Sequence, residues 1–503
     1  MHLLLVLAIT IQIDASADRH RIDPRVYGLN WASEAQLQDL NVQLNRAGGN
    51  ATTRYNWQLK STNHASDWYF ESLENEPIEP FIEATRRAGA EPMITIPIIG
   101  WVARLGPEGE RRCSFSIAKY GPQQDNDWQW FPDCGNGRRS DGTIMTGNDP
   151  NDANMPVEPS FLRPWVRELA EKHGVRYFLL DNEHGLWHET HRDVKPIGAT
   201  MEEIRERITA FSTMIKEEAP KAIVLGTEEW GWLGYLMSGY DKQWAEKNGN
   251  WQSTPDRIAH GGMDYSPWIL REVDGHLDVF SLHIYPQGGE FSNDTSPDMQ
   301  LRRNRSTRAL WDPSYRDETW IDDTVKLIPR MKAWAAPYGL PIGITEYSWG
   351  ADEYMNGATA QADILGILGR EGVDLAARWV TPVTGSPAYN AIRMYRNYDG
   401  ARSTFGEWSV RATVPQPDEV AAFAAIRLSD GALTVMLINK TTAPQDVTVD
   451  VDHFQQRGPA QRWQLTDAGI ARVADVNTLA LTLPSQSVTL LVVPGAKKRR
   501  SVR

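Results

Sequence analysis

This 503-residue chain has few basic residues, few cysteines and no long apolar run, and each of these features excludes a class of protein. Positive charge is scarce: 52 Lys and Arg stand against 65 Asp and Glu, for a net charge of −13. Nucleic-acid binding needs clustered basic residues, so no such partner is expected, and Lys497 to Arg500 is interpreted as a solvated basic tail. No run approaches the ~20 apolar residues of a membrane span, so no membrane partner is expected either.

Cysteine is also scarce, with only Cys113 and Cys134. Neither a CxxC pair nor a histidine cluster accompanies them, which argues against zinc. Both lie in one tryptophan-rich stretch that has no helical or strand period. An exported protein would join them in a disulfide closing a modest loop, whereas a cytosolic one would keep them reduced. The sequence leaves both states open.

The first residues allow two interpretations. Met1 to Ile9 resembles the apolar region of a signal peptide, and Ala15 to Ala17 resembles its cleavage site, although a basic start is lacking. Ile9 to Asp14, by contrast, alternates apolar and polar residues as a strand does. We favour a structural strand, with Met1 to Ala8 as a clipped or artificial start.

Apolar strand-like runs alternate with amphipathic helical segments over residues 22–410. This order predicts an α/β fold, a (β/α)8 TIM barrel. The expected strands are Tyr27–Leu29, Gly49–Thr52, Met93–Pro97, Tyr177–Leu180, Ile223–Leu225, Val279–Leu282, Ile342–Ile344 and Ala377–Val380. Thr200 and Glu203 predict a capped helix start before an apolar stripe. Two long insertions, Trp101–Pro159 and Pro286–Glu318, are expected as loop excursions at the C-terminal face, where such barrels build active sites.

The pattern changes over residues 411–503. Short segments there alternate with period two and are separated by turn residues, without an intervening helical pattern. This predicts a C-terminal antiparallel β-sandwich domain that ends in the basic tail. Residues 1–21 are expected to add an N-terminal strand to that sheet.

Two glutamates end predicted barrel strands. Glu183 follows an apolar run in YFLLDNEHGLW, and Glu346 follows another in PIGITEYSWG. These are the fourth and seventh strands, which lie across the barrel from each other, so the two carboxylates can face one another. One protonated acid and one ionised acid are what a retaining glycoside hydrolase needs. A separation near ~5 Å would imply retention, and a wider gap would imply inversion.

Neighbouring polar residues are assigned supporting roles. Asn182 is placed to donate a hydrogen bond to a sugar 2-hydroxyl, and Tyr285 to hold the nucleophile Glu346 ionised. His283 either supports the substrate cleft or is a core histidine with a backbone partner. Glu229 is a rival catalytic acid at the end of the fifth strand. We interpret it as a substrate-binding or supporting residue, because it lies less directly opposite Glu346.

The tryptophans are numerous and unevenly placed, with twenty in the chain. Each one alone is as readily a core residue, but those at strand ends together favour a long polysaccharide groove, because rings stack on sugar C–H faces. The strand-end tryptophans are Trp31, Trp57, Trp101, Trp187, Trp230, Trp232, Trp349 and Trp379. Asn56, beside Trp57, is a candidate partner for sugar hydroxyls.

The segment Asp149 to Asn154 is rich in oxygen ligands. Asp149 and Asp152 could take part in a calcium site, which uses carboxylate and carbonyl oxygens. The spaced pattern of an EF-hand is missing, so an Asx-turn loop is the favoured interpretation.

Several longer motifs carry a family resemblance. They are NATTRYNW, DWYFES, CSFSIAKYGPQ, TGNDPNDAN, YFLLDNEHGLWHETHRDVKP, EEWGW, HGGMDY, FSLHIYPQGGEFS, RRNRSTRALWDP, GITEYSWG and MYRNYDG. Together they resemble glycoside hydrolase family 44, the endoglucanases and xyloglucanases of plant-cell-wall-degrading bacteria. The resemblance implies a (β/α)8 barrel with a β-sandwich and retaining hydrolysis of β-1,4-glucans, with Glu183 as acid/base and Glu346 as nucleophile. It also implies secretion and, with Asp149 and Asp152 as candidates, a structural calcium ion.

One departure from the family pattern is visible. The resemblance leads us to expect proline after the acid/base, and this chain has His184. A charged histidine there would shift the pH optimum, but a substitution without effect is favoured.

We therefore predict a retaining endo-β-1,4-glucanase acting on cellulose, carboxymethyl-cellulose and xyloglucan. It is expected to be a monomer that needs no cofactor for catalysis. The alternatives are the same chemistry on xylan, mannan or mixed-linkage glucan, and a non-catalytic polysaccharide-binding protein.

Overall fold

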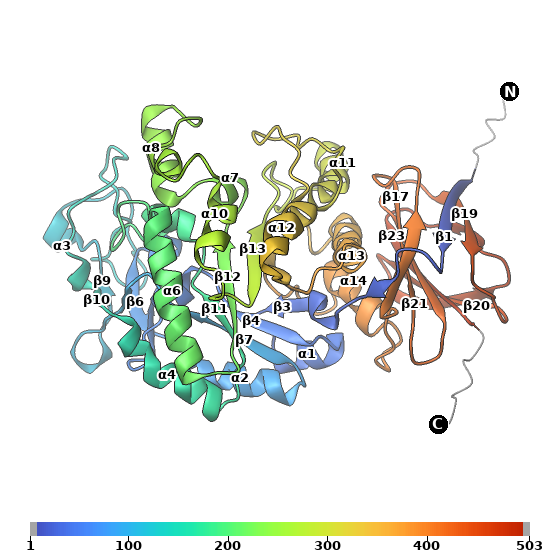
Figure 1. The fold of residues 1–503 in the computed structure, drawn as a ribbon, viewed down its shortest axis with the longest axis horizontal. Helices are drawn as coiled ribbons and strands as arrows, with labels where there is room; N and C mark the ends of the chain where they lie inside the picture. The colour runs from blue at the N-terminus through green and yellow to red at the C-terminus, as the bar shows by residue number, and fades with distance from the viewer. Residues whose placement is uncertain (1–7, 496–503) are drawn as a thin grey trace. The chain divides into compact units, whose positions relative to one another are not determined.

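The computed structural model describes residues 8–495, and their central feature is a closed eight-stranded barrel (Figure 1). The strands follow the order β11-β12-β13-β14-β15-β3-β4-β7. The predicted barrel is confirmed. The barrel strands are β3 (Gly28–Asn30), β4 (Leu44–Ala47), β7 (Glu91–Ile96), β11 (Tyr177–Leu180), β12 (Ile223–Glu229), β13 (Val279–Ile284), β14 (Ile342–Tyr347) and β15 (Leu375–Arg378).

The second barrel strand lies elsewhere than predicted. Gly49–Thr52 is not a strand: Gly49 has a φ of 91°, and a 3-10 helix, η2 (Asn50–Arg54), follows it. The strand is β4, whose sequence LNRA contains the buried side chains of Asn45 and Arg46. Apolar runs did not indicate this strand, because two of its four residues are polar and are buried only through tertiary contacts.

The chain divides into two compact units. The first comprises Leu44–Ile284 and Met331–Thr345. In it β4, β7, β11, β12 and β13 are parallel neighbours. Its helices are α2 (Ile78–Arg87), α3 (Ile117–Tyr120), α4 (Pro159–Glu171), α5 (Trp187–Thr190), α6 (Met201–Glu218), α7 (Trp232–Leu236), α8 (Gly239–Asn248), α9 (Pro255–Ala259) and α10 (Tyr265–Glu272), together with most of α12 (Leu327–Ala335).

Helix α6 forms where its sequence predicts. Thr200 caps it by accepting the backbone N–H of Glu203. Its apolar stripe is buried, and Figure 1 shows α6 lying beside α4, against which it packs. The stripe comprises Ile204, Ile208, Phe211 and Ile215.

The excursion from Trp101 to Pro159 is mostly irregular, as predicted, but it contains three short strands, β8 (Trp101–Ala103), β9 (Arg112–Cys113) and β10 (Asn154–Pro156). Strand β8 pairs with β10. Strand β9 joins β6 (Glu71–Glu74), which pairs with β5 (Ser61–Asn63). A disulfide joins Cys113 and Cys134, which resolves the two states left open above.

The second unit comprises Met1–Gln43, Tyr285–Arg330 and Glu346–Arg503. Its strands β3 and β15 are parallel neighbours. Its helices are α1 (Glu34–Leu40), α11 (Pro297–Ser306), α13 (Met355–Arg370) and α14 (Pro387–Arg396). The presence of α11 corrects the expectation that Pro286–Glu318 is a loop excursion: Pro297 at its first turn favours a helix start despite the polar sequence.

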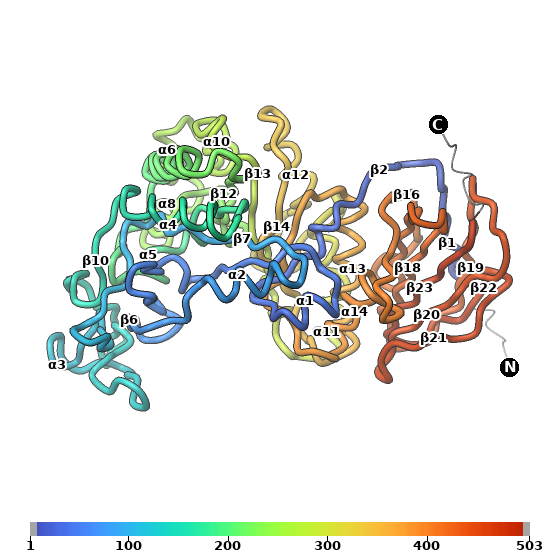
Figure 2. The backbone as a smooth tube through the Cα atoms, turned by 90° about the horizontal axis from the view of Figure 1, so that it is seen from below, coloured from blue at the N-terminus to red at the C-terminus, as the bar shows by residue number. Residues whose placement is uncertain are grey.

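The C-terminal domain is a ten-stranded, mostly antiparallel sheet (Figure 2). Strand β1 (Ile9–Asp14) lies within it, antiparallel to β16 and parallel to β19. One hydrophobic core takes residues from both ends of the strand order, including Val449, Leu483 and Ala460, so the sheet folds over on itself. The remaining strands are β2 (His20–Arg21), β16 (Trp408–Thr413), β17 (Val420–Ile426), β18 (Leu433–Asn439), β19 (Gln445–Asp452), β20 (Ala460–Thr466), β21 (Gly469–Val476), β22 (Ala480–Leu483) and β23 (Ser487–Val493).

Helix α13 packs against β17, β18 and β23 of this domain and is buried along almost its whole length. At Gly366 a Cβ atom would stand 2.1 Å from the ring of Phe423, so the close approach of helix and sheet requires glycine. The basic tail, Lys497 to Arg500, and Met1 to Leu7 of the supposed artificial start lie outside the described residues. No described helix is long and apolar enough to cross a membrane.

Candidate active site

Glu183 stands on a sharp turn directly after the buried strand β11. Asp181 and Glu183 both have left-handed backbone, with φ of 67° and 47°. Such conformations are costly for residues other than glycine and gather at functional sites. Asp181 secures the turn, because its carboxylate accepts the backbone N–H groups of Ile98 and Ile99. The Glu183 side chain remains partly exposed.

A row of three side chains begins at Glu183. Its Oε1 lies 3.0 Å from Nδ1 of His283, and Nε2 of His283 lies 3.2 Å from Oε2 of Glu228. Burial by itself would raise the pKa of Glu228, but the bond from His283 and the charge of Arg46 outweigh it and hold that pKa below its usual value. A neutral His283 would carry its proton on Nε2, which faces the ionised Glu228. Its Nδ1 would then accept a hydrogen bond from a protonated Glu183.

Arg46 and Asn182 extend this network. Arg46 donates through Nη2 to Oδ1 of Asn182 at 3.2 Å and contacts Oε2 of Glu228 at 3.4 Å. Asn182 is buried, and its amide donates to Oδ1 of Asn50 at 3.3 Å. The predicted donor to a sugar hydroxyl therefore already has protein partners at both ends of its amide.

Glu346 is the second-last residue of β14, and Tyr285 directly follows β13. The Tyr285 hydroxyl donates to Oε2 of Glu346 at 2.9 Å. This is the contact that the sequence predicts.

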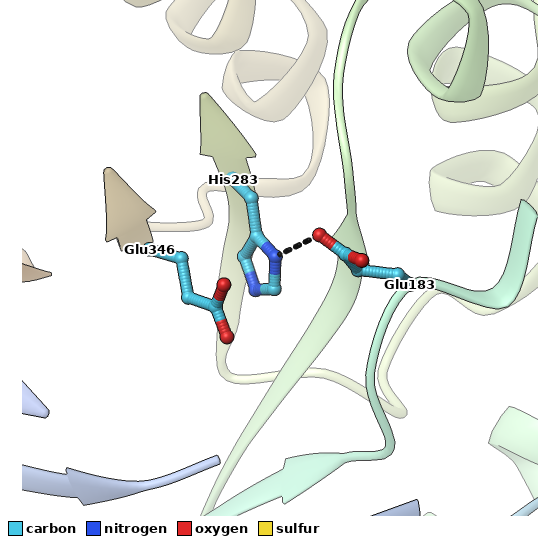
Figure 3. Close-up of side chains that lie close together, drawn as sticks. All are labelled: Glu183, His283 and Glu346. Atoms are coloured by element: carbon cyan, nitrogen blue, oxygen red, sulfur yellow. Dashed lines mark hydrogen bonds and ion pairs between the residues drawn. The ribbon is translucent and has the colours of Figure 1, made fainter. Parts of the chain in front are cut away.

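Glu183, His283 and Glu346 lie close together (Figure 3). One oxygen of each carboxylate and one ring nitrogen of His283 all lie within 4.8 Å of one another. Carboxyl groups are about 5–5.5 Å apart in retaining glycosidases and about 6.5–9.5 Å apart in inverting ones. The pair therefore fits the shorter spacing.

His184 and Glu229 form a buried, uncharged pair beside Glu183. His184 donates through Nε2 to the carbonyl of Leu180 at 2.8 Å, and burial lowers its pKa to about 4. Glu229 accepts the N–H of Gly185 at 3.1 Å, and burial raises its pKa to about 8. At neutral pH both side chains are neutral, so His184 brings no charge to the acid. Glu229 is enclosed by protein atoms, which corrects its interpretation as a residue that binds substrate directly.

The predicted aromatic residues differ in exposure. Trp57, Trp101, Trp230 and Trp379 are half-exposed, so their rings can present a face to a ligand. Trp349 is only 2% exposed, and its indole N–H donates to Oγ of Ser306 at 2.9 Å. Its predicted stacking on sugar is therefore wrong. Helix α11, which brings Ser306, was absent from the sequence prediction.

Two further predictions meet side chains that already have partners. Asn56 is buried, donates to the carbonyl of Ala103 and accepts two backbone N–H groups, so it shapes a turn instead of binding sugar. Asp149 accepts the N–H of Asn151 in the favoured Asx turn. Both oxygens of Asp152 lie within 2.7 Å of Nζ of Lys119. A lysine ammonium at that point does not fit calcium coordination, and the calcium site stays a prediction.

Sequence reasoning missed Glu228 and Arg46, and it assigned His283 to the cleft or the core without predicting its contacts with Glu183 and Glu228. In a regular strand Glu229 would share a face with Thr227, and Glu228 would point to the other face. A bulge between Thr227 and Glu229, with a φ of 56° at Glu228, breaks that alternation. Only the adjacent acidic pair in TEEW could have drawn attention to the position.

A family model and several known proteins resemble the chain. The model of glycoside hydrolase family 44 matches residues 61–288. The crystal structure of CelM2, a bifunctional glucanase-xylanase protein from a metagenome library, shares 54% identity and a TM-score of 0.95, with 97% of this chain and 99% of that chain covered. A Paenibacillus polymyxa xyloglucanase from family 44 shares 26% identity and a TM-score of 0.78, with 97% and 99% covered.

A curated relative is longer. Beta-mannanase/endoglucanase A of Caldicellulosiruptor saccharolyticus is 27% identical over 90% of this chain. The chain spans only 36% of the length of that protein.

Proposed function

This chain belongs to glycoside hydrolase family 44, and on that premise we propose that it is a retaining endo-β-1,4-glucanase. The observation that carries the proposal is the spacing of Glu183 and Glu346, whose nearest carboxylate oxygens and the intervening His283 nitrogen lie within 4.8 Å of one another. That spacing supports a nucleophile and an acid acting on one glycosidic bond, and it is shorter than the gap that holds the attacking water in inverting enzymes.

The reaction runs in two displacements. In the first, a carboxylate oxygen of Glu346 forms a bond to the anomeric carbon while the glycosidic C–O bond breaks and Glu183 gives its proton to the leaving oxygen. In the second, Glu183 takes a proton from water, the water oxygen bonds to the anomeric carbon, and Glu346 leaves. The carboxyl groups and water complete the cycle, so we propose no cofactor for catalysis.

The contacts around the two acids support these separate roles. Tyr285 donates a hydrogen bond to Oε2 of Glu346 and so fixes the position of the nucleophile. His283, fixed by Glu228, offers Nδ1 to Glu183 and so favours its protonated form at the start of the cycle. The two carboxyl groups thus have different partners, a hydroxyl donor at Glu346 and an imidazole nitrogen at Glu183.

The substrate is proposed to be a β-1,4-glucan backbone such as cellulose, carboxymethyl-cellulose or xyloglucan. The half-exposed rings of Trp57, Trp101, Trp230 and Trp379 suit sugar faces. Xylan is a second candidate substrate, favoured by the 54% identity to a bifunctional glucanase-xylanase.

We further propose that the protein is secreted and acts as a monomer. The Cys113–Cys134 disulfide supports an oxidising compartment. A monomer suffices because one chain supplies both catalytic acids.

The test is hydrolysis of xyloglucan and cello-oligosaccharides, with the anomer of the first product read by NMR. Retention is expected, and net inversion would overturn the mechanism. Glu346→Gln should abolish turnover on every substrate. Glu183→Gln should still release dinitrophenol from dinitrophenyl cellobioside, because that leaving group needs no proton. If Glu183→Gln released no dinitrophenol, the assignment of Glu183 as the catalytic acid would be wrong.

A further inference from the structure

Three exposed tryptophans surround one buried carboxylate; Trp128 and Trp130 lie in the disulfide-bonded excursion, and Trp68 lies before it in the chain. Trp128 is 75% exposed, Trp130 60% and Trp68 40%. Asp127 is buried, and its Oδ1 accepts the backbone N–H of Trp130 at 3.1 Å while its Oδ2 lies 3.4 Å from the indole nitrogen of Trp68. We call Trp68, Trp128 and Trp130 the tryptophan platform.

The platform stands on an ordered base. The backbone N–H of Phe131 donates to the backbone carbonyl of Asp127 at 3.1 Å, and the backbone N–H of Cys134 donates to the backbone carbonyl of Phe131 at 2.8 Å. Cys134 is joined by its disulfide to Cys113 in β9. The rings are therefore presented by a braced turn, so they lose little conformational entropy when a ligand binds.

Large exposed aromatic rings in a cluster mark an interaction surface. The charged residues between positions 124 and 134 are all acidic, namely Asp125, Asp127 and Asp133, and Nη1 of one basic side chain, Arg111, lies 3.9 Å from Oδ2 of Asp127. Acidic neighbours disfavour nucleic acid and anionic polymers. A neutral polysaccharide fits both features, because its sugar C–H faces stack on indole rings and its hydroxyls donate to carboxylates.

The platform is connected to the segment that carries Glu183. Helix α5, which begins four residues after Glu183, packs against η3 (Ala65–Asp67), the turn directly before Trp68. Arg192, just beyond α5, lies with its guanidinium 4.3 Å from the ring centre of Phe70. Figure 1 shows the surrounding excursion at α3, β9 and β10. A surface here is thus built onto the chain segment of the catalytic acid.

We propose that the tryptophan platform is an auxiliary binding surface for a neutral β-glucan chain, outside the bond-cleaving centre. It rests on the proposed function, since the polymer it holds is the substrate of the active site. The platform retains polymer at the enzyme and contributes nothing to the cleavage of oligosaccharides too short to reach it.

The first experiment measures binding without turnover. In a Glu346→Gln background, retardation in native gels containing xyloglucan is compared with and without the added pair Trp128→Ala and Trp130→Ala. Trp251→Ala is the matched control, because Trp251 is 41% exposed between α8 and α9. We expect the double variant to lose about tenfold or more in affinity and the control to lose none. Equal retardation of the double variant and its parent would overturn the proposal.

The second experiment measures turnover in the active enzyme. The double variant should raise KM on xyloglucan about tenfold and leave kcat/KM on cellotetraose unchanged. An equal loss on both substrates would mean that the substitutions damage the fold, and unaltered KM on xyloglucan would also count against the platform. If sedimentation showed instead that the substitutions dissociate a dimer, the platform would be an interface with a second copy.

Failure of the proposed function would look different. A wild-type protein that hydrolyses no glucan would refute the glucanase, whereas the gel retardation still reports whether the platform binds polymer.

Discussion

Replacing Glu229 with glutamine tests the choice of catalytic acid and the effect of burial together. Glu229 is buried beneath Gly185, and burial raises its pKa to about 8. Below that pH the folded protein holds it as an uncharged acid, which glutamine matches in shape and charge. We expect Glu229→Gln to keep nearly wild-type kcat/KM on xyloglucan. Glu183→Gln should lose about 10²- to 10⁴-fold.

The magnitude of the stability change follows from linkage. The same carboxyl group titrates near pH 4.5 in the unfolded chain, so above that pH folding requires proton uptake. Because the pKa of Glu229 is raised in the folded protein, the contribution of Glu229 to the free energy of unfolding is fully present below pH 4.5. It is lost as the pH rises through 8. At about 1.4 kcal/mol per pH unit, the wild-type protein loses about 2 kcal/mol by pH 6 and up to about 5 kcal/mol by pH 8. Glutamine does not titrate, so the variant should escape this loss.

The assay is urea unfolding of wild type and variant at pH 5, 6, 7 and 8, together with hydrolysis of xyloglucan. Glu228→Gln is the matched control, since it alters a buried carboxylate that is ionised and contacts Arg46. It should destabilise the protein by about 3–5 kcal/mol. A stability gap between wild type and Glu229→Gln that does not widen with pH would refute the burial argument. An inactive Glu229→Gln beside an active Glu183→Gln would make Glu229 the catalytic acid.

Three further variants test other contacts. Tyr285→Phe removes one hydrogen bond to Glu346, worth about 1.5–3 kcal/mol, so kcat/KM on dinitrophenyl cellobioside should fall about 10- to 100-fold; unchanged kinetics would dismiss that contact. Replacing both Cys113 and Cys134 by serine opens a loop of 21-residue separation and should cost about 3 kcal/mol in urea unfolding, a loss that dithiothreitol should reproduce in the wild type. His184→Gln should stabilise the protein at acid pH. The pKa of His184 is lowered to about 4. Its contribution to the free energy of unfolding is therefore fully present above pH 6.5 and is lost as the pH falls toward 4. A gain in the melting temperature of the variant that is equal at pH 4.5 and pH 7 would contradict this.

Local sequence patterns predicted most of the architecture, with the second barrel strand and helix α11 as exceptions. Fully apolar runs such as Tyr177–Leu180, and helical stripes such as that of α6, report burial on a strand or a helix face without knowledge of any partner. Glu183 and Glu346 were proposed as the catalytic pair because each comes at the end of such a run, and a barrel brings strand ends to one face. Tyr285 was found by the same reasoning.

Burial of polar side chains was decided only in three dimensions. The strand β4 contains Asn45 and Arg46, which are buried because their partners come from other elements. The same holds for Trp349, whose indole is buried against Ser306 of helix α11. Neither the sequence of β4 nor the sequence around Trp349 indicates these partners.

The choice between Glu228 and Glu229 shows the division between sequence and structure. Their sequence, TEEW, determines that two acids end the fifth barrel strand. Which of them joins His283, and which stays protonated beneath Gly185, depends on a strand bulge and on residues distant in the chain. The sequence by itself thus determined most of the elements, the barrel and the strand-end positions of the two proposed catalytic glutamates, because periodicity and apolar runs are local. The protonation and partners of the surrounding acids were decided by tertiary structure, because a carboxyl group's charge depends on its burial and on charges brought beside it by folding.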